Sequence, residues 1–145
     1  MIVPDVNLLM HAYNAESPVH SAARAWWERL LNGTQPVGLA WAVILGFIRL
    51  ATNRQVVQHP LSPAAACAHP RSWLAQPYVT IAHPGDRHAQ IVFGLLETAG
   101  AAGNLTTDAH LAALAIEYQG EVHSTDADFS RFPGVRWINP IADPR

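Results

Sequence analysis

Short apolar runs alternate with longer stretches of helical periodicity along the chain. Each run holds only a few residues, which is typical of strands in a sheet that is covered on both faces. We expect five strands, at residues 2–3, 37–40, 78–81, 121–124 and 135–138. We expect helices at residues 6–13, 18–31, 41–51, 63–74, 87–99 and 106–118. This alternation predicts an α/β fold, a three-layer sandwich in which helices flank a mostly parallel five-stranded sheet.

Polar residues, prolines and glycines mark the ends of several helices. The pair Ser17–Pro18 is typical of an N-cap that is followed by proline at the first helical position. Asp86 is placed to cap the helix at 87–99, and Gly120 to stop the helix that precedes it.

Two tryptophans, Trp26 and Trp27, stand side by side in the helix predicted at 18–31. Adjacent helical residues point about 100° apart. We therefore expect one of the two to be exposed or to lie in an interface with a protein partner.

The composition fits a single folded domain over residues 1–145. Half of the residues are hydrophobic and 14% are charged, which excludes a disordered chain. The formal net charge of −2 excludes a strongly basic protein that coats nucleic acid.

Residue types that are rare or missing exclude further kinds of chemistry. Cys67 is the one cysteine, so an internal disulfide framework and a cysteine-based zinc site are excluded. All nine basic residues are arginine, and without lysine neither P-loop phosphate binding nor Schiff-base catalysis is available. The apolar stretch at 37–50 is short and interrupted, and no basic segment precedes the first strand. We therefore expect no membrane span, no secretory signal and a cytoplasmic location.

Three aspartates occupy positions where an α/β sheet binds its ligands. Asp5 follows the first strand, Asp126 follows the strand at 121–124, and Asp108 lies in the first turn of a helix. If the first and fourth strands are neighbours, these carboxylates face one cleft, with Asp128 close by. Gathered carboxylates repel one another, and a hard divalent cation such as Mg²⁺ or Mn²⁺ relieves that repulsion. The cluster therefore indicates metal-assisted hydrolysis of a phosphodiester bond.

Each of these acids also has a purely structural explanation. The helix dipole favours an acid such as Asp108 near a helix N-terminus. Asp5, Asp126 or Asp128 can serve as the cap of the turn or helix that follows it. Neighbouring polar side chains can orient the acids or can simply satisfy local turns; these are Asn7, Thr107, Ser124 and Thr125.

Four segments resemble the motifs of PIN domains, in particular those of VapC-type toxins. Residues 2–9 (IVPDVNLL) resemble the opening strand with its Asp-x-Asn, and residues 46–52 (GFIRLAT) resemble a helix of these toxins. Residues 105–115 (LTTDAHLAALA) resemble the third acidic motif, and residues 123–129 (HSTDADF) resemble the fourth. The segments follow the family's order and span most of the chain.

The resemblance implies a PIN fold and an endoribonuclease that depends on Mg²⁺ or Mn²⁺. It implies the toxin of a type II toxin–antitoxin pair, commonly a homodimer, that cuts structured RNA such as tRNA or ribosomal RNA and is neutralised by a VapB-type antitoxin. By correspondence, Asp5, Asp108 and Asp126 are the catalytic and metal-binding acids, and Asp128 is an additional ligand or supports the others. Asn7, Thr107 and Ser124 are the matching supporting residues.

One acid of the family pattern is missing. VapC-type PIN domains usually carry a Glu in the helix predicted at 41–51, where this chain has Ile44, Leu45 and Gly46. Either three acids and more water hold the ion, or Asp128 compensates, or activity is reduced.

Three functional hypotheses remain open. The first is an RNA hydrolase, with Arg24, Arg49, Arg54 and Arg87 as candidate phosphate contacts. The second is a catalytically impaired PIN fold that binds RNA or an antitoxin without cutting. The third is a phosphoryl-transfer enzyme on a similar sheet, against which Asn7 stands where that chemistry requires a second Asp after Asp5.

Overall fold

A computed structural model of the chain describes residues 1–142, so the last three residues of the domain predicted over 1–145 lie outside the described part. The strands are β1 (Ile2–Pro4), β2 (Val37–Leu39), β3 (Val79–Ile81), β4 (Glu121–His123) and β5 (Trp137–Ile138). The helices are α1 (Val6–Tyr13), α2 (His20–Asn32), α3 (Trp41–Ala51), α4 (Pro63–Leu74), α5 (His88–Ala99) and α6 (Thr106–Glu117), with 3-10 turns η1 (Gly103–Leu105) and η2 (Ala127–Arg131). No helix in this part of the chain has the length and apolarity needed to cross a bilayer.

The five strands form one sheet in the order β3-β2-β1-β4-β5. All four strand pairs are parallel, which confirms the predicted sheet. The predicted neighbours β1 and β4 pair in register, with Val3 opposite Val122 and Pro4 opposite His123.

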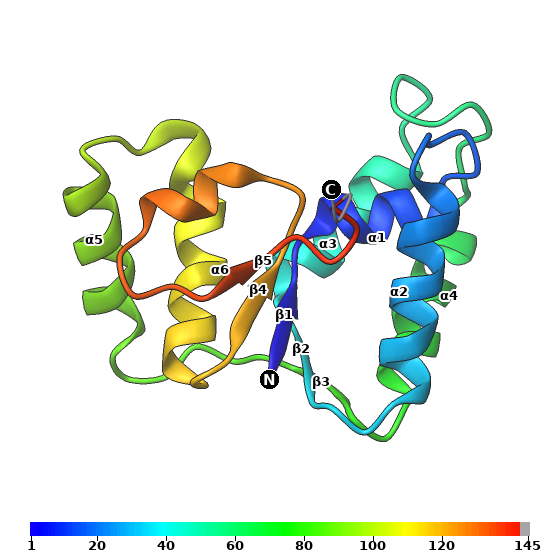
Figure 1. The fold of residues 1–145 in the computed structure, drawn as a ribbon. Helices are drawn as coiled ribbons and strands as arrows, with labels where there is room; N and C mark the ends of the chain where they lie inside the picture. Colours follow the sequence, from blue (N-terminus) through cyan, green and yellow to red (C-terminus); the bar gives the residue numbers. More distant parts are fainter. Residues whose placement is uncertain (143–145) are drawn as a thin grey trace.

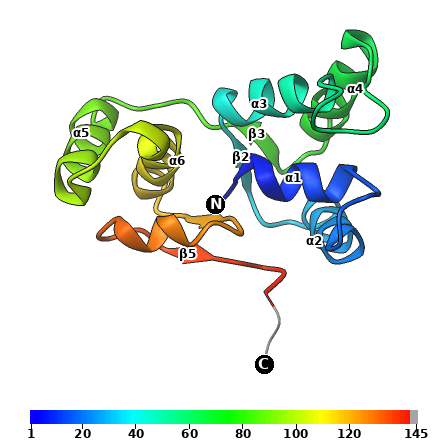
Figure 2. The same ribbon diagram turned by 90° about the horizontal axis from the view of Figure 1, so that it is seen from above.

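Helices cover the two faces of the sheet unequally (Figure 1). Helices α1 to α4 lie on one face, and α5 and α6 lie on the other (Figure 2). The strand order explains this division, because the chain moves from β1 to β2 and β3 in one direction and then returns to β4. Right-handed crossovers in opposite directions place their helices on opposite faces. The carboxyl ends of β1 and β4 therefore form the switch point at which α/β sheets bind ligands.

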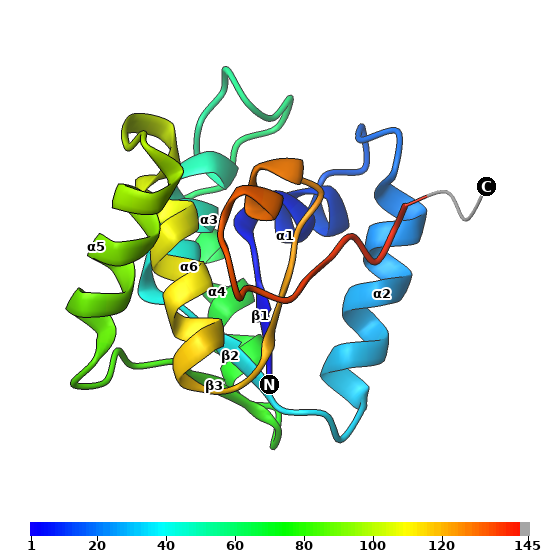
Figure 3. The same cartoon turned by 60° about the vertical axis from the view of Figure 1, so that its left-hand side comes forward.

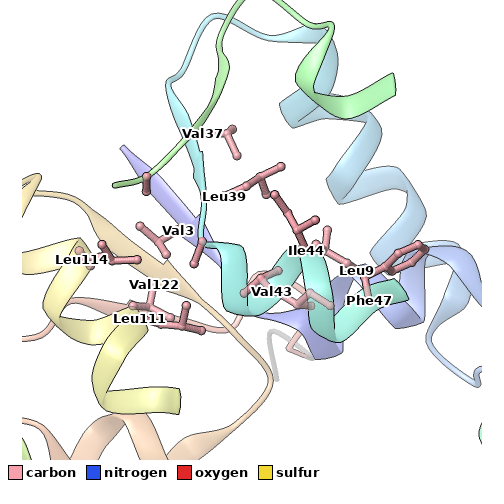
Figure 4. Packing of buried hydrophobic residues seen from close by; sticks show 14 of the residues in the cluster. Val3, Leu9, Val37, Leu39, Val43, Ile44, Phe47, Leu111, Leu114 and Val122 are labelled. Carbon is pink, nitrogen blue, oxygen red and sulfur yellow. The ribbon is translucent and has the colours of Figure 1, made fainter. Parts of the chain in front are cut away.

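The core consists of two apolar layers on the two sides of the sheet (Figure 4). On one side Leu111 and Leu114 of α6 lie near the sheet residues Val3 and Val122. On the other side α1 and α3 contribute Leu9, Val43, Ile44 and Phe47, all of them buried. Strands β1 and β2 are buried along their whole length, which is why they appear in the sequence as uninterrupted apolar runs.

The expectation that Trp26 or Trp27 is exposed is wrong, because these side chains are only 3% and 5% exposed. With Ala23 they form an apolar stripe on α2 that is wide enough to include adjacent positions. Trp26 stacks toward His123 of β4, whereas Trp27 packs edge-on against Trp73 of α4. Helix α2 therefore buries both rings between two different neighbours.

Two predicted helix starts are also wrong. Helix α2 begins at His20 rather than at Pro18, because Ser17 forms a turn in which its hydroxyl accepts from the amide of Val19. Helix α5 begins at His88 without a side-chain cap, and Asp86 is exposed. By contrast, Ser62 caps α4, accepting from the amide of Ala65 at 3.2 Å.

Helix α6 ends in a way that the sequence obscures. The left-handed residue at its end is Gln119, with a φ of 54°, and the amides of Gln119 and Gly120 bond back to Ile116 and Ala115. Gly120 does not supply the left-handed turn; a side chain there would collide with the backbone of Met1. The predicted stop signal is thus a site of close approach between the start of β4 and the chain's first residue.

Candidate active site

Asp5 lies where β1 ends and α1 begins, as its position in the sequence predicts. Its Oδ1 accepts from the amide of Val6 at 2.7 Å and its Oδ2 accepts from the hydroxyl of Ser124 at 2.7 Å. The residue is only 7% exposed. Asp5 therefore serves as the N-cap of α1 and also anchors that helix to the end of β4.

Ser124 is the centre of a buried hydrogen-bond network that joins the ends of β1 and β4. Its hydroxyl donates to Asp5 and accepts from Asn7 Nδ2 at 3.1 Å and from the amide of Asp126 at 3.0 Å. A hydroxyl has one proton and two lone pairs, so all of its hydrogen-bonding capacity is used. Asn7 Oδ1 completes the network by accepting from the amide of Thr125 at 3.5 Å. Two of the predicted supporting residues, Asn7 and Ser124, thus contact the predicted site.

Three aspartates come together beside this network. Asp108, Asp126 and Asp128 each offer a carboxylate oxygen, and these oxygens lie within 4.8 Å of one another. Asp108 comes from the first turn of α6, whereas Asp126 is the residue before η2 and Asp128 lies in η2, which follows β4. Figure 3 shows η2, in orange, at the same end of the molecule as the start of α1. We call Asp5, Asp108, Asp126 and Asp128 the acid cleft.

The electrostatics of the acid cleft reflect burial and mutual repulsion. Burial raises the pKa of Asp108 to about 7, and the charges of Asp5, Asp126 and Asp128 add to the increase. Burial also raises the pKa of Asp5, against the lowering effect of its hydrogen bonds to Ser124 and Val6. In the absence of a cation, the acid cleft therefore retains a proton near neutral pH.

The structural explanations of the acids also hold in part. Asp126 Oδ1 accepts from the amide of Asp128 at 2.9 Å, so Asp126 caps η2. Capping uses one carboxylate oxygen and leaves the other available. Capping and ligand binding are therefore compatible for Asp126, whereas both oxygens of Asp5 already accept a hydrogen bond, one from Val6 and one from Ser124.

Some predicted residues lie away from the acid cleft. Thr107 is exposed, and within residues 1–142 its hydroxyl makes no hydrogen bond to the acids. Arg24 pairs with Glu28 at 2.8 Å on the exposed side of α2. Arg49 is exposed in the last turn of α3. None of the three joins the network described above.

Helix α3 supplies no acid to the cleft. Ile44 is buried in the core and Leu45 is 59% exposed. Gly46 faces α1, and a Cβ at this position would lie 3.4 Å from Cγ2 of Val6, the residue after Asp5. The acid that is missing from the sequence pattern is therefore not replaced from this helix.

His123 is a polar residue of this region whose importance the sequence did not indicate. It lies on β4, one residue before Ser124, and it is 7% exposed. Burial lowers its pKa, against the raising effect of the nearby Glu121. Strand β4 has only three residues, so the sequence gives no pattern that identifies the partners of His123, and only the three-dimensional contacts do.

Known proteins resemble the chain over almost its entire length. The PIN domain family model matches residues 2–135. Ribonuclease VapC33 of Mycobacterium tuberculosis is 45% identical over 143 residues, which cover 99% of this chain and 100% of the relative. Ribonuclease VapC37 of the same species is 42% identical over 142 residues, covering 98% of this chain and 99% of the relative.

Solved structures share the fold at lower sequence identity. Mycobacterium tuberculosis VapC20, described as a sarcin-ricin loop cleaving toxin, has a TM-score of 0.67 at 20% identity and covers 94% of this chain and 99% of its own. FitAB bound to a DNA fragment has a TM-score of 0.69 at 15% identity and covers 100% of this chain and 99% of its own.

Proposed function

The chain belongs to the PIN domain family, and on that premise we propose that it is an endoribonuclease that acts as the toxin of a type II toxin–antitoxin pair. Its full-length relatives at 42–45% identity are ribonucleases of the VapC group. The observation that carries the proposal is the acid cleft, in which Asp108, Asp126 and Asp128 offer carboxylate oxygens within 4.8 Å of one another. Asp5, at the carboxyl end of β1, is near enough for its charge to raise the pKa of Asp108, at the switch point of the sheet.

We propose that the cleft binds Mg²⁺ or Mn²⁺ through Asp108, Asp126 and Asp128, with Asp5 beside them. The donor set fits such an ion, because it consists of carboxylate oxygens and contains no sulfur or imidazole ligand. When bound, the ion neutralises charge on a phosphate oxygen and lowers the pKa of a water molecule.

The chain's own residues then orient and deprotonate the attacking water. Asp5 is fixed by Ser124 and Val6, so its carboxylate keeps one orientation. The attacking water gives its proton to a carboxylate of the acid cleft or to solvent. The water oxygen forms a bond to phosphorus, the bond from phosphorus to the 3′ oxygen breaks, and the 3′ oxygen takes a proton from solvent. The products are a 3′-hydroxyl and a 5′-phosphate.

The substrate is a structured RNA, tRNA or ribosomal RNA, by analogy with the VapC20 toxin. Of the predicted RNA contacts, Arg49 is exposed and forms no ion pair within residues 1–142, so it can bind a phosphate, whereas Arg24 would first have to release Glu28. The toxin acts in the cytoplasm, where its RNA substrates occur.

The protein partner is a VapB-type antitoxin, since solved neighbours include VapBC complexes such as that of nontypeable Haemophilus influenzae.

The toxin also forms a homodimer. Trp41 and Leu45 lie one turn apart on α3 and are 52% and 59% exposed, so they offer an apolar surface for such contacts. Light scattering of the purified chain tests the homodimer.

The central experiment is a cleavage assay with the purified chain, Mn²⁺ and a panel of structured RNAs. We expect cleavage that disappears in Asp5→Asn, while the circular dichroism spectrum stays unchanged. RNA binding without cleavage by the wild-type protein would contradict the enzyme and support the second function.

That second function is an impaired PIN fold that binds RNA or antitoxin, and the absence of an acid on α3 favours it. Gly46→Glu distinguishes the two, because it adds a carboxylate beside Val6, the residue that follows Asp5. A large gain in Mn²⁺ affinity and cleavage would indicate that the natural cleft is impaired. Unchanged cleavage would indicate that the existing acids suffice.

A further inference from the structure

A chain of hydrogen bonds connects α2 with β4 near the acid cleft, and it begins in the buried core. The indole Nε1 of Trp26 donates to His123 Nδ1 at 3.1 Å. His123 Nε2 lies 2.9 Å from Glu121 Oε1, and the other oxygen of Glu121 accepts from Arg136 at 3.1 Å. Trp26 and His123 are buried, so water does not compete for the bond between them, whereas the bond from Arg136 to Glu121 is exposed.

The indole N–H of Trp26 determines which group donates and which accepts in each of these hydrogen bonds. An indole N–H can only donate, so His123 Nδ1 must accept and carries no proton. The ring proton therefore sits on Nε2 and is donated to Glu121. His123 is held as a single neutral tautomer by a donor on one side and an acceptor on the other.

The backbone of His123 carries this constraint into the acid cleft. Its carbonyl accepts from the amide of Asp5 at 2.9 Å. The next residue, Ser124, donates its hydroxyl proton to the carboxylate of Asp5 at 2.7 Å. A shift of β4 at His123 would therefore move both contacts that Asp5 makes with this strand.

We propose that His123 is a positioning residue for the acid cleft, locked by Trp26 and Glu121 so that β4 presents its backbone and Ser124 to Asp5. This inference rests on the proposed nuclease function, in which Asp5 is catalytic. Neither Trp26 nor His123 touches the substrate, and both act through the end of β4.

The chain provides a matched pair of tryptophans for the test. Trp27 is adjacent to Trp26 and equally buried, but within residues 1–142 its indole N–H has no hydrogen-bond partner. Trp26→Phe removes the donor that holds His123, whereas Trp27→Phe removes a donor that holds nothing. Both replacements retain an aromatic ring in the core.

Replacements of His123 separate the two hydrogen bonds. His123→Asn keeps an acceptor close to the position of Nδ1, and His123→Leu keeps neither group. If His123→Leu does not fold, Trp26→Phe still tests the inference, because it leaves His123 in place.

Kinetics and NMR are measured on the same variants. We expect Trp26→Phe and His123→Leu to lower kcat for RNA by about 10-fold, with KM unchanged, as for other residues that orient metal ligands. His123→Asn should recover part of the loss. The ¹⁵N spectrum should show the Nε2–H tautomer in wild type and a mixture in Trp26→Phe, and exchange of the Asp5 amide should be faster in that variant. Trp27→Phe should match wild type in every readout.

Two outcomes would overturn the inference. One is a folded Trp26→Phe with wild-type kcat, tautomer and Asp5 amide exchange; the other is equal losses in Trp26→Phe and Trp27→Phe. A wild-type chain that does not cut RNA would contradict the proposed function instead, and the NMR readouts would still decide whether His123 positions Asp5.

Discussion

The chain holds carboxylates in two contrasting environments. Glu117 accepts from the backbone amide of Gly85 at 3.1 Å and pairs with His88 at 3.0 Å, between α5 and α6. Asp108, which lies on the same helix α6, faces Asp126 and Asp128 instead. Within residues 1–142, no arginine or histidine forms an ion pair with any acid of the cleft.

This difference separates a structural carboxylate from a functional one. Glu117 has donors around it and stabilises the contact between two helices. The acids of the cleft have mainly one another, so their arrangement costs free energy until a cation joins them. Concentrated charge without a counter-charge is therefore better evidence of a ligand site than burial or helix position.

The contacts of Glu117 with Gly85 and His88 are called the clamp below. The largest expected effect comes from removing one carboxylate from the acid cleft and, in a parallel variant, one from the clamp. Asp126→Asn should lower RNA cleavage by about 100-fold or more, because orienting partners of metal ligands alone contribute about 10- to 100-fold. Glu117→Gln should leave cleavage unchanged. Initial rates at saturating Mn²⁺ measure both variants, and equal losses would mean that the cleft has no special role.

The next effect concerns stability with and without a divalent ion. At about 100 times its Kd, an ion that binds only the folded state raises the free energy of unfolding by about 2.7 kcal/mol. We expect Mn²⁺ to stabilise wild type and Glu117→Gln against urea by similar amounts, and Asp126→Asn hardly at all. Identical stabilisation of all three proteins would place the ion outside the acid cleft.

The pH dependence of the metal-free protein follows from the raised pKa of Asp108. Its ordinary pKa is 3.8 and its folded-state pKa is about 7, so the folded state binds the proton more tightly. Its contribution to stability is fully present below pH 3.8, falls between pH 3.8 and 7, and is constant above that range. The pKa of Asp5 is also raised in the folded state, so its contribution has the same sign.

Asp108→Asn removes this contribution. In urea unfolding with EDTA, the stability advantage of Asp108→Asn over wild type should therefore grow as the pH rises from 4.5 to about 7. A stability difference between the two proteins that does not change with pH would show that the pKa of Asp108 is not raised. Glu117→Gln is the control, because it removes a carboxylate charge from the same helix outside the acid cleft.

The smallest effect is the loss of the clamp itself. Glu117→Gln should cost about 1–2 kcal/mol of stability, because a partly buried hydrogen bond to a charged group is weakened. The loss should be similar with and without Mn²⁺, since the clamp binds no ion. The urea midpoints of Glu117→Gln and wild type measure this loss of stability. A loss that appears only with Mn²⁺ would contradict the assignment of Glu117 as a structural carboxylate that binds no ion.

The elements that the sequence predicted correctly are those with local signals. The buried strands and α6 follow from uninterrupted apolar runs and from helical periodicity. The errors at Ser17 and Asp86 have one cause: a residue that can cap a helix can equally form a turn before it. The burial of both Trp26 and Trp27 depends on neighbours on two sides of α2, which no local pattern reveals.

By itself, the sequence determined the alternation of strands and helices and the places of Asp5, Asp108 and Asp126 after or at the start of these elements. Backbone periodicity and the ends of strands are local properties, so they are written in neighbouring residues. Only the tertiary structure decided that Asp128 belongs to the closest group of acids and that Asp5 is held by Ser124. The contact between Asp5 and Ser124 joins residues 119 positions apart, and it exists because β1 and β4 pair at the centre of the sheet.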